Sequence, residues 1–203
     1  YLGFKPVMWS VVEQTALAEA EIEYHEKKSN SIYVKFPVKK LDDKTSIVIW
    51  TTTPWTIPCN KAIAFSNDLN YIMLQINDDI ERLNLEKNEK LIIAENLLNH
   101  FIEKHKIKSS KVISKVNRDF LEEIHCNHPL KDSGYIHNVK LFESSHVTDE
   151  SGSGFVHIAP NHGLEDFEVG KKNDLGNEST INEKGVYEES IPIFSGLHIF
   201  KAD

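Results

Sequence analysis

The sequence predicts a mixed α/β fold, and three observations support that prediction. Short apolar segments rich in β-branched residues recur along the chain, bounded by residues that favour turns. A few segments with helical spacing of apolar residues lie between them. The two kinds do not alternate in the regular order of a parallel βαβ fold, so we expect a mixed or closed sheet with flanking helices.

Length and composition are those of an ordinary globular protein. The 203 residues are enough for one well-cored domain or for a core with a small appendage, and 40% of them are hydrophobic and 27% charged. No apolar run approaches the roughly 20 residues that a membrane helix needs, and no signal peptide opens the chain, so we expect no membrane contact. The two cysteines, which lack C-x-x-C spacing, fit a reducing, cytoplasmic setting. Because the chain starts at Tyr1 rather than at a methionine, we expect a piece of a larger protein.

Charge and cysteine content disfavour several further classes. Cys59 and Cys126 show no C-x-x-C spacing, which disfavours both a disulfide framework and a cysteine zinc site. A net charge of −8 disfavours a broad nucleic-acid surface, which would normally be basic. A small contact with the end of a nucleic acid stays open.

The first part of the chain predicts a helix and then a hairpin. Residues 13–24 are alanine-rich and acidic, with apolar residues at roughly helical spacing, which indicates a short helix. Residues 31–38 alternate apolar and polar side chains and predict a half-buried strand. A turn over 40–44 leads to a β-branched run at 46–51, so these two strands should pair.

The middle of the chain predicts more short strands and one helix. Strands are expected at 62–65 and 71–76, joined by a segment rich in turn residues, and again at 90–94. Residues 95–107 carry apolar side chains at helical spacing. A further strand is expected at 112–116.

The last part predicts two helices and two strands. Asn117 is a suitable N-cap for a helix that runs through Ile124. Strands are expected at 135–142 and 155–158. Residues 163–172 carry acidic side chains first and basic side chains last, which suits the helix dipole and predicts a helix.

A cluster of potential metal ligands lies between these elements. His125, Cys126 and His128 are close in sequence, but no fourth ligand stands at a suitable spacing and Pro129 breaks the element. We therefore expect an ordinary loop here and no metal site.

A row of three threonines is the first candidate for function. Thr51, Thr52 and Thr53 end a predicted strand, and they lie between Trp50 and Trp55. One threonine would be explained by its preference for strands. Three in succession at a strand end indicate a row of hydroxyl groups along one rim of the fold.

The second candidate is a strand–turn–helix segment. Gly152 and Gly154 permit a tight turn before a strand that carries His157, and Asp166 follows in the first turn of the next helix. Asp166 could serve the helix dipole alone. The unit could also aim both side chains into one cleft, where a carboxylate would suit a cationic group such as the ammonium of an amino acid.

The common hydrolase motifs are missing from the sequence. It contains no G-x-S-x-G, no H-E-x-x-H and no phosphate-binding G-x-x-x-x-G-K-[ST]. A catalytic role would therefore rest on positioning water and polarising a carbonyl rather than on a covalent nucleophile.

Together, the two candidate segments resemble the editing domain that is inserted in class I isoleucyl-tRNA synthetases. Residues 51–60 are similar to that family's threonine-rich motif, and residues 152–166 are similar to its second motif. Valyl and leucyl editing domains carry an arginine where this chain has Thr53, so the threonine indicates the isoleucyl type. The resemblance extends over nearly the whole chain but is dense only in these segments and in a few flanking ones.

Four positions beside the motif residues depart from the family pattern. Ser153 stands for a usual threonine, Cys59 for a small residue, Asn161 for glycine and Glu165 for aspartate. Each change is modest, so the resemblance still implies activity.

The resemblance implies a closed β-barrel core with flanking helices. It also implies that residues 1–203 are a single editing domain excised from a larger synthetase, with 1–28 and 185–203 near the junctions with the catalytic domain. The implied activity is hydrolysis of the ester of valine mischarged onto isoleucine tRNA, and hydrolysis of valyl-adenylate is open. A pocket built for isoleucine cannot strongly reject valine, which is one methylene smaller, so a second pocket must remove the error.

The resemblance also implies a role for each motif residue. Asp166 would hold the substrate ammonium, and His157 would form the wall that excludes the extra methyl group of isoleucine. Thr53 and Asn60 would position the attacking water, helped by the vicinal ribose hydroxyl of the tRNA. The remaining motif residues would line the pocket (Thr51 and Thr52, with Thr53) and pack against the terminal adenosine (Trp50).

The implied partners are the 3′ end of isoleucine tRNA carrying valine, valyl-adenylate, and the rest of the parent synthetase. No cofactor is expected for this domain, whereas the parent ligase would use ATP and Mg²⁺. A non-catalytic insertion that only binds the aminoacylated tRNA end is the main alternative. A free-standing nucleotide- or sugar-binding barrel is a third hypothesis, which rests on fold alone.

Overall fold

The computed structural model describes residues 5–26, 28–39, 41, 44–176 and 178–202. The chain divides into two compact units: unit 1 comprises Tyr1–Ser31, Thr52–Lys61 and Ile158–Asp203, and unit 2 comprises Ile32–Thr51 and Ala62–His157. The chain thus crosses from one unit to the other inside each motif, after Thr51 and after His157. Whether residues 1–203 act as a single editing domain stays a prediction.

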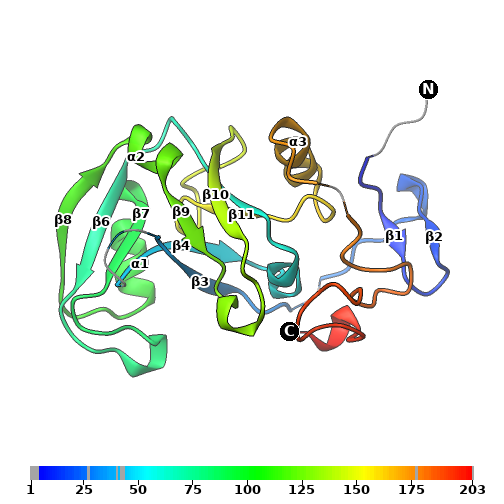
Figure 1. Ribbon diagram of the computed structural model, residues 1–203, viewed down its shortest axis with the longest axis horizontal. Helices are drawn as coiled ribbons and strands as arrows, with labels where there is room; N and C mark the ends of the chain where they lie inside the picture. Colours follow the sequence, from blue (N-terminus) through cyan, green and yellow to red (C-terminus); the bar gives the residue numbers. More distant parts are fainter. Residues whose placement is uncertain (1–4, 27, 40, 42–43, 177, 203) are drawn as a thin grey trace. The chain divides into compact units, whose positions relative to one another are not determined.

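A mixed five-stranded sheet forms much of unit 2 (Figure 1). In spatial order its strands are β3 (Ile32–Pro37), β4 (Thr45–Thr51), β7 (Lys90–Ala94), β6 (Tyr71–Ile76) and β8 (Ser110–Val116). β4 and β7 run parallel, and the other neighbours run antiparallel. Both faces of β4 are covered, since Ile47, Val48 and Ile49 are all buried, which explains its continuous apolar sequence.

A second, four-stranded sheet carries the strand of the second motif. Its order is β11 (Val156–Ile158), β5 (Ala62–Phe65), β10 (Asn138–Glu143) and β9 (His125–Asn127). β10 pairs parallel with β5 and antiparallel with β9. An isolated bridge between Val38 and Cys126 joins β9 to the chain just after β3.

Five short helices accompany the two sheets in the described part of unit 2. They are η3 (Glu81–Leu83), η4 (Glu95–Leu97) and η5 (Lys131–Ser133), all 3₁₀ helices, and α2 (Arg118–Glu123); η4 continues directly into a longer helix, α1 (Leu98–Lys104). Asn117 caps α2 by accepting a hydrogen bond from the backbone N–H of Phe120 at 2.9 Å.

The main core of unit 2 lies between the five-stranded sheet and α1. Its buried side chains are Val48, Ile72, Leu74, Ile76, Leu85, Leu91, Ile93, Phe101 and Ile107. Most come from β6 and β7, and Phe101 comes from α1, whose neighbours Leu98 and Ile102 pack on the same cluster. The helical spacing of these three α1 side chains is therefore explained by one buried face.

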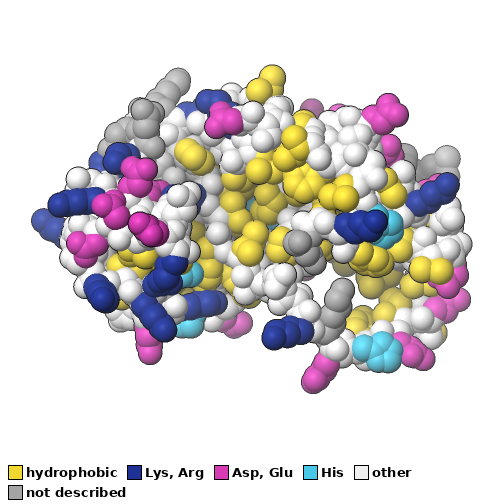
Figure 2. Space-filling model, turned by 90° about the horizontal axis from the view of Figure 1, so that it is seen from below, with side chains coloured by type: hydrophobic (Ala, Val, Ile, Leu, Met, Phe, Trp, Pro, Cys, Tyr) yellow, Lys and Arg dark blue, Asp and Glu magenta, His cyan; other side chains and the backbone are white. Residues whose placement is uncertain are grey.

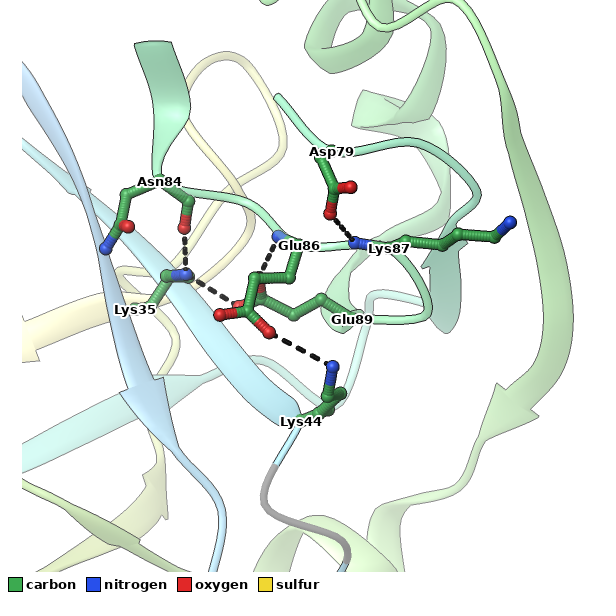
Figure 3. Close-up of polar contacts among 7 residues, drawn as sticks. All are labelled: Lys35, Lys44, Asp79, Asn84, Glu86, Lys87 and Glu89. Atoms are coloured by element: carbon green, nitrogen blue, oxygen red, sulfur yellow. Dashed lines mark hydrogen bonds and ion pairs between the residues drawn. The ribbon is translucent and has the colours of Figure 1, made fainter. Parts of the chain in front are cut away.

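A polar network fixes the connection between β6 and β7 (Figure 3). The ammonium of Lys35 on β3 donates to the carbonyl oxygen of Asn84 and to Glu89 Oε1, both at 2.6 Å. Glu89 Oε2 accepts from the backbone N–H of Glu86 at 3.0 Å. Because the Glu89 side chain is only 9% exposed, its pairing with Lys35 satisfies a charge that would otherwise be costly to bury.

Unit 1 has few regular elements. They are β1 (Trp9–Ser10) and β2 (Thr15–Ala16), which pair antiparallel, the 3₁₀ helices η1 (Glu19–Glu21), η2 (Pro54–Cys59) and η6 (Ile199–Lys201), and α3 (Leu164–Lys172). Turns and isolated bridges organise its C-terminal stretch, including the bridges Ile181–Tyr187 and Val186–His198.

Most of the predicted strands and helices are confirmed. The strands predicted at 31–38 and 46–51 form the antiparallel pair β3–β4, although residues 40, 42 and 43 of the predicted turn lie outside the described residues. The strands predicted at 62–65, 71–76, 90–94, 112–116, 135–142 and 155–158 correspond to β5, β6, β7, β8, β10 and β11. The helices predicted at 95–107, after Asn117 and at 163–172 correspond to η4–α1, α2 and α3.

Two predictions of secondary structure are wrong. Residues 13–24 form β2 and a single 3₁₀ turn instead of a helix; none of the η1 residues is buried, and short helices need tertiary packing to persist. His125–Asn127 is strand β9 rather than loop, because it pairs with β10. His128 is buried beside Phe36 and Tyr135.

The predicted mixed α/β class is confirmed, but the closed barrel is not. Among the described residues the two larger sheets have free ends, at β3 and β8 in one and at β11 and β9 in the other. Within the described part of the chain, pairing continues from one sheet toward the other at the isolated Val38–Cys126 bridge and at the hydrogen bond from Lys39 N–H to the His125 carbonyl oxygen. Closure would require ladder hydrogen bonds along both pairs of ends.

Candidate functional site

The threonine row is divided between the two units. Thr51 is the last residue of β4 and is buried, whereas Thr52 and Thr53 are exposed and belong to unit 1. Pro54 occupies the first position of η2, where its fixed φ and missing N–H are tolerated. The chain therefore turns immediately after Thr53.

Backbone and side-chain hydrogen bonds hold the start of η2. The backbone N–H of Thr56 donates to the carbonyl oxygen of Thr53 at 3.0 Å, and its hydroxyl donates to the same oxygen at 2.8 Å. The hydroxyl groups of Thr53 and Thr56 are 3.5 Å apart. Thr53 is thus held in a defined position at the entrance to the helix.

Asn60 lies at the other end of η2 and is 1% exposed. Its backbone N–H donates to the carbonyl oxygen of Ile57 at 3.0 Å and closes the helix. The next residue, Lys61, donates its N–H to the carbonyl oxygen of Ile158 at 2.9 Å. Asn60 is therefore fixed next to the end of β11.

Asp166 is anchored to the same end of β11. It lies in the first turn of α3, and its Oδ2 accepts a hydrogen bond from the backbone N–H of Ala159 at 2.8 Å. Asn60 and Asp166, far apart in sequence, are thus tied to the consecutive residues Ile158 and Ala159 within unit 1.

The environment of the Asp166 carboxyl group favours its neutral form. Burial raises its pKa from 3.8 to about 6, the hydrogen bond from Ala159 opposes that rise, and the nearby Glu165 adds to it. The Asp166 side chain makes no other hydrogen bond or ion pair with a residue that the structure describes. A cation bound at this carboxylate would lower its pKa again.

In unit 2, the Gly152–Gly154 turn is pressed against the five-stranded sheet. A Cβ atom on Gly152 would lie 3.1 Å from Trp50 Cβ, and one on Gly154 would lie 2.3 Å from Ala94 Cβ. Both glycines have positive φ angles, of 82° and 79°. The carbonyl oxygens of the turn accept hydrogen bonds at 2.9 Å: that of Ser153 from Ala94 N–H, and that of Gly154 from the Tyr71 hydroxyl. The turn fixes the start of the chain that leads into β11.

The other two predicted residues of unit 2 lie on strands. His157 is the middle residue of β11 and is 6% exposed. Trp50 pairs with Tyr33 across β3 and β4, and its ring centroid is 6.5 Å from that of Tyr33. The seven predicted residues therefore divide into Trp50, Thr51 and His157 in unit 2 and Thr52, Thr53, Asn60 and Asp166 in unit 1.

A cluster of side chains that contacts η2 was not predicted from the sequence. His162 Nε2 lies 2.9 Å from the hydroxyl of Thr180, and the Trp55 ring stands edge-on to His162 with centroids 5.3 Å apart. The Tyr187 hydroxyl donates to the carbonyl oxygen of Trp55, and the Cys59 thiol is hydrogen-bonded to Thr180. His162 lies within the second motif, but nothing in the sequence marks Thr180.

Burial shifts the titration of this cluster. It lowers the pKa of His162 from 6.5 to about 4 and raises the pKa of the Cys59 thiol to about 11. Both groups are therefore neutral at pH 7. They support η2 by packing and hydrogen bonding rather than by charge.

Neither a metal site nor a membrane-spanning helix has a candidate among the described residues. Across the described part of the chain, no group of three or more His, Cys, Asp or Glu side chains is placed to hold a metal ion. No helix within that part is long and apolar enough to cross a membrane.

Two solved structures illustrate the similarity in fold. The P. knowlesi cytosolic leucyl-tRNA synthetase editing domain matches with a TM-score of 0.57 at 9% identity, covering 87% of this chain and 91% of that chain. GlLeuRS-CP1 matches with a TM-score of 0.54 at 15% identity, covering 70% and 59%. The fold is that of the synthetase editing domains.

Relatives in sequence are isoleucine–tRNA ligases. The isoleucine–tRNA ligase of Pelagibacter ubique is 45% identical over 208 residues, which cover 100% of this chain and 22% of the ligase. The isoleucine–tRNA ligase of Rhodopseudomonas palustris is 41% identical over 98% of this chain and 21% of its own length. No family model matches the chain. The chain belongs to the isoleucine–tRNA ligase family, has the fold of the synthetase editing domains, and spans about a fifth of the length of these relatives.

Proposed function

We propose that this editing domain hydrolyses the ester of valine mischarged onto isoleucine tRNA. The observation that supports the proposal best is the joint anchoring of Asn60 and Asp166 at Ile158–Ala159. This arrangement provides a carboxylate for an ammonium group and polar side chains for a water molecule within unit 1.

Asp166 is assigned to the substrate ammonium. One carboxylate oxygen accepts from Ala159 N–H, which fixes the orientation of the group and leaves the other oxygen for the ligand. Because burial raises the pKa to about 6, this carboxylate is weakly solvated and gains more from a bound cation than an exposed one would.

Thr53 and Asn60 are assigned to the attacking water. Hydrogen bonds to Thr56 hold Thr53, and the bond to Ile57 holds Asn60, so both can orient a water molecule with little loss of entropy. His162 is a poor general base because its pKa is lowered to about 4. We therefore assign assistance in proton transfer to the vicinal ribose hydroxyl of the tRNA.

Trp50, Thr51, Thr52 and His157 are assigned to recognition. In this proposal His157 is the wall that admits valine and excludes isoleucine, Trp50 packs against the terminal adenosine, and Thr51 lines the pocket with Thr52. Exclusion by overlap is effective because an extra methyl group in a filled space costs roughly 1–3 kcal/mol. The rigid Gly152–Gly154 turn supports the strand that carries His157.

The proposed partners are the 3′ end of isoleucine tRNA carrying valine, valyl-adenylate, and the rest of the parent ligase. The hydrolytic step needs no cofactor from this domain; ATP and Mg²⁺ would serve the ligase reaction. The alternative, a non-catalytic insertion that only binds the aminoacylated end, predicts binding of a valyl-adenosine analogue without turnover of valyl-tRNA.

Removal of the Asp166 carboxylate tests the proposal. In the intact protein, Asp166→Ala should slow hydrolysis of valyl-isoleucine tRNA by about 10- to 100-fold, the value of a hydrogen bond to a charged group. Glu165→Ala is the matched control, because Glu165 is an exposed carboxylate on the same helical turn and should leave the rate within a few-fold of wild type. Equal rates for the two variants would remove Asp166 from substrate binding.

Truncation of His157 tests the specificity assignment. His157→Ala should open the pocket, so that correctly charged isoleucyl-tRNA becomes a substrate while valyl-tRNA is still hydrolysed. The measurement is deacylation of both tRNAs by the same variant. A variant that still spares isoleucyl-tRNA, while hydrolysing valyl-tRNA, contradicts the steric role.

A further inference from the structure

The segment from Lys104 to Arg118 is basic in an acidic chain. It contains Lys104, Lys106, Lys108, Lys111, Lys115 and Arg118 and no aspartate or glutamate, although the whole chain has 31 acidic and 23 basic residues. The segment runs from the last residue of α1 through a connection and along β8. We call it the lysine run.

The lysine run is exposed at the edge of unit 2. β8 is the end strand of the five-stranded sheet, and every one of its residues from Lys111 to Lys115 is exposed. Figure 2 shows Lys and Arg side chains gathered at the lower left, toward the end at which Figure 1 draws β8. Asp and Glu side chains lie on the same side in Figure 2, so what this place offers to an anionic ligand is an excess of positive charge.

Acidic neighbours neutralise only part of the run. Lys115 lies 3.6 Å from Glu95, and Arg118 lies 2.6 Å from Glu122. The other four lysines are exposed and form no ion pair with any residue that the structure describes: Lys104, Lys106, Lys108 and Lys111.

Protection of an edge strand does not account for the whole run. Lysines on an end strand discourage pairing with other chains, and this role is sufficient for Lys111 and Lys115 on β8. Lys104, Lys106 and Lys108 lie before the strand, where there is no edge to protect. Edge protection therefore leaves these three charges unexplained.

Lys104 connects the run to the aromatic pair on β3 and β4. Its ammonium lies 5.0 Å from the ring centroid of Tyr33 and 5.8 Å from that of Trp50, both within unit 2. Phe101 and His105 on and after α1 pack against Tyr33 with centroids 5.5 and 4.5 Å away. The first cation of the run is therefore placed over Trp50 by packing and by cation–π attraction.

We propose that the lysine run binds the phosphates of the single-stranded 3′ end of the tRNA, with Lys104 beside the nucleotide that packs against Trp50. This inference rests on the proposed function, which assigns Trp50 to the terminal adenosine. Aromatic rings that stack bases beside cations that follow the backbone are the usual elements of a single-strand binding surface. Tyr33 and Trp50 supply the rings and the lysine run supplies the cations, on a chain whose net charge is otherwise unsuited to RNA.

The test compares charge-neutral variants in the intact protein. Lys104→Gln and the triple variant Lys106→Gln/Lys108→Gln/Lys111→Gln are measured for deacylation of valyl-isoleucine tRNA over a salt series. Lys87→Gln is the control, because Lys87 is exposed in the same unit and its side chain points away from the network in Figure 3. Lys104→Arg keeps the cation and should restore the wild-type values.

We expect the charge-neutral variants to raise KM and to leave kcat unchanged. For the triple variant, the slope of log kcat/KM against log salt should become shallower by about 2. Three phosphate contacts are lost, and each contributes roughly 0.7 to the slope on a single strand. The control should keep the wild-type slope. Equal slopes and equal KM values for the triple variant, Lys104→Gln and the control would overturn the proposal.

A direct binding measurement separates this inference from the proposed function. The probe is an RNA hairpin with a single-stranded 3′ overhang that ends in adenosine and carries no amino acid. If valyl-tRNA is not hydrolysed by the wild type but the triple variant lowers the salt slope of hairpin binding, the function fails and the phosphate surface stands. If the wild type hydrolyses valyl-tRNA but no variant changes hairpin binding, the function stands and the phosphate surface is overturned.

Discussion

Two opposing influences set the pKa of the Asp166 carboxyl group. Its place in the first turn of α3 and its bond to Ala159 N–H favour the carboxylate, whereas burial and Glu165 favour the neutral acid. Burial is the larger effect, and the pKa rises to about 6. The group is thus ionised at pH 7 but poorly solvated, which suits a site for a cation.

The pH dependence of editing should report this carboxyl group. Only ionised Asp166 attracts an ammonium, so kcat/KM for valyl-tRNA should rise as pH increases through about 6. It should fall again when the substrate amine loses its proton, since the pKa of a free α-amino group is about 7.7–8.0. A pH profile corrected for spontaneous hydrolysis checks this, and Asp166→Asn should remove the acid limb. An unchanged acid limb in Asp166→Asn would assign the titration to another group.

At the scale of elements, two connections determine where the motifs lie. The Gly152–Gly154 turn fits against Trp50 and Ala94, and η2 is held by Tyr187 and His162. In both, residues outside the strands and helices make the contacts that orient them. Loop contacts of this kind are typical of sites built on a rigid sheet.

A pair of glycine substitutions tests how closely the Gly152–Gly154 turn packs against β7. Gly154→Ala combines a positive φ with a Cβ that would lie 2.3 Å from Ala94 Cβ, whereas Gly196→Ala has a similar φ of 76° and no atom within 4 Å. Gly196→Ala should cost about 1–2 kcal/mol of unfolding free energy from backbone strain, and Gly154→Ala about 1–3 kcal/mol more from overpacking. Denaturant unfolding of both variants measures the difference. Equal losses would mean that the turn can move away from β7.

At the scale of the molecule, regular structure is concentrated in unit 2. Its five-stranded sheet carries the apolar cluster around β6 and β7, whereas unit 1 is assembled from three stretches of chain with short elements. β1 and β2 are two residues each, and both residues of β2 are exposed. Local stability should follow this difference in burial.

Amide hydrogen exchange should map that difference. Residues of β6 have strand neighbours on both sides and buried side chains on the core face, so their amides should exchange slowest. Amides of β1 and β2 should exchange much faster, because a short exposed pair of strands opens at little cost. Mass spectrometry of the native protein measures both. Equal protection would show that packing beyond the described contacts stabilises the β1–β2 pair.

The sequence by itself determined the strands whose patterns are dictated by burial, such as β3 and β4, and the helices with clear caps or one apolar face, such as α2 and α1. These patterns are local, so they can be read without knowing the neighbours. The motif residues and the isoleucyl family could also be identified from sequence, because their order along the chain is specific. The helix expected at 13–24 failed because local propensity is too weak without a surface to pack on.

Only the tertiary structure decided which distant residues meet. Strand β9 depends on β10, the open sheets depend on pairing at β3, β8, β9 and β11, and the joint anchoring of Asn60 and Asp166 depends on β11. The support of η2 by Thr180 and the placement of Lys104 over Trp50 have no local signature. Each is a contact between residues far apart in sequence, and such contacts are set by the global minimum of packing and hydrogen bonding rather than by any local pattern.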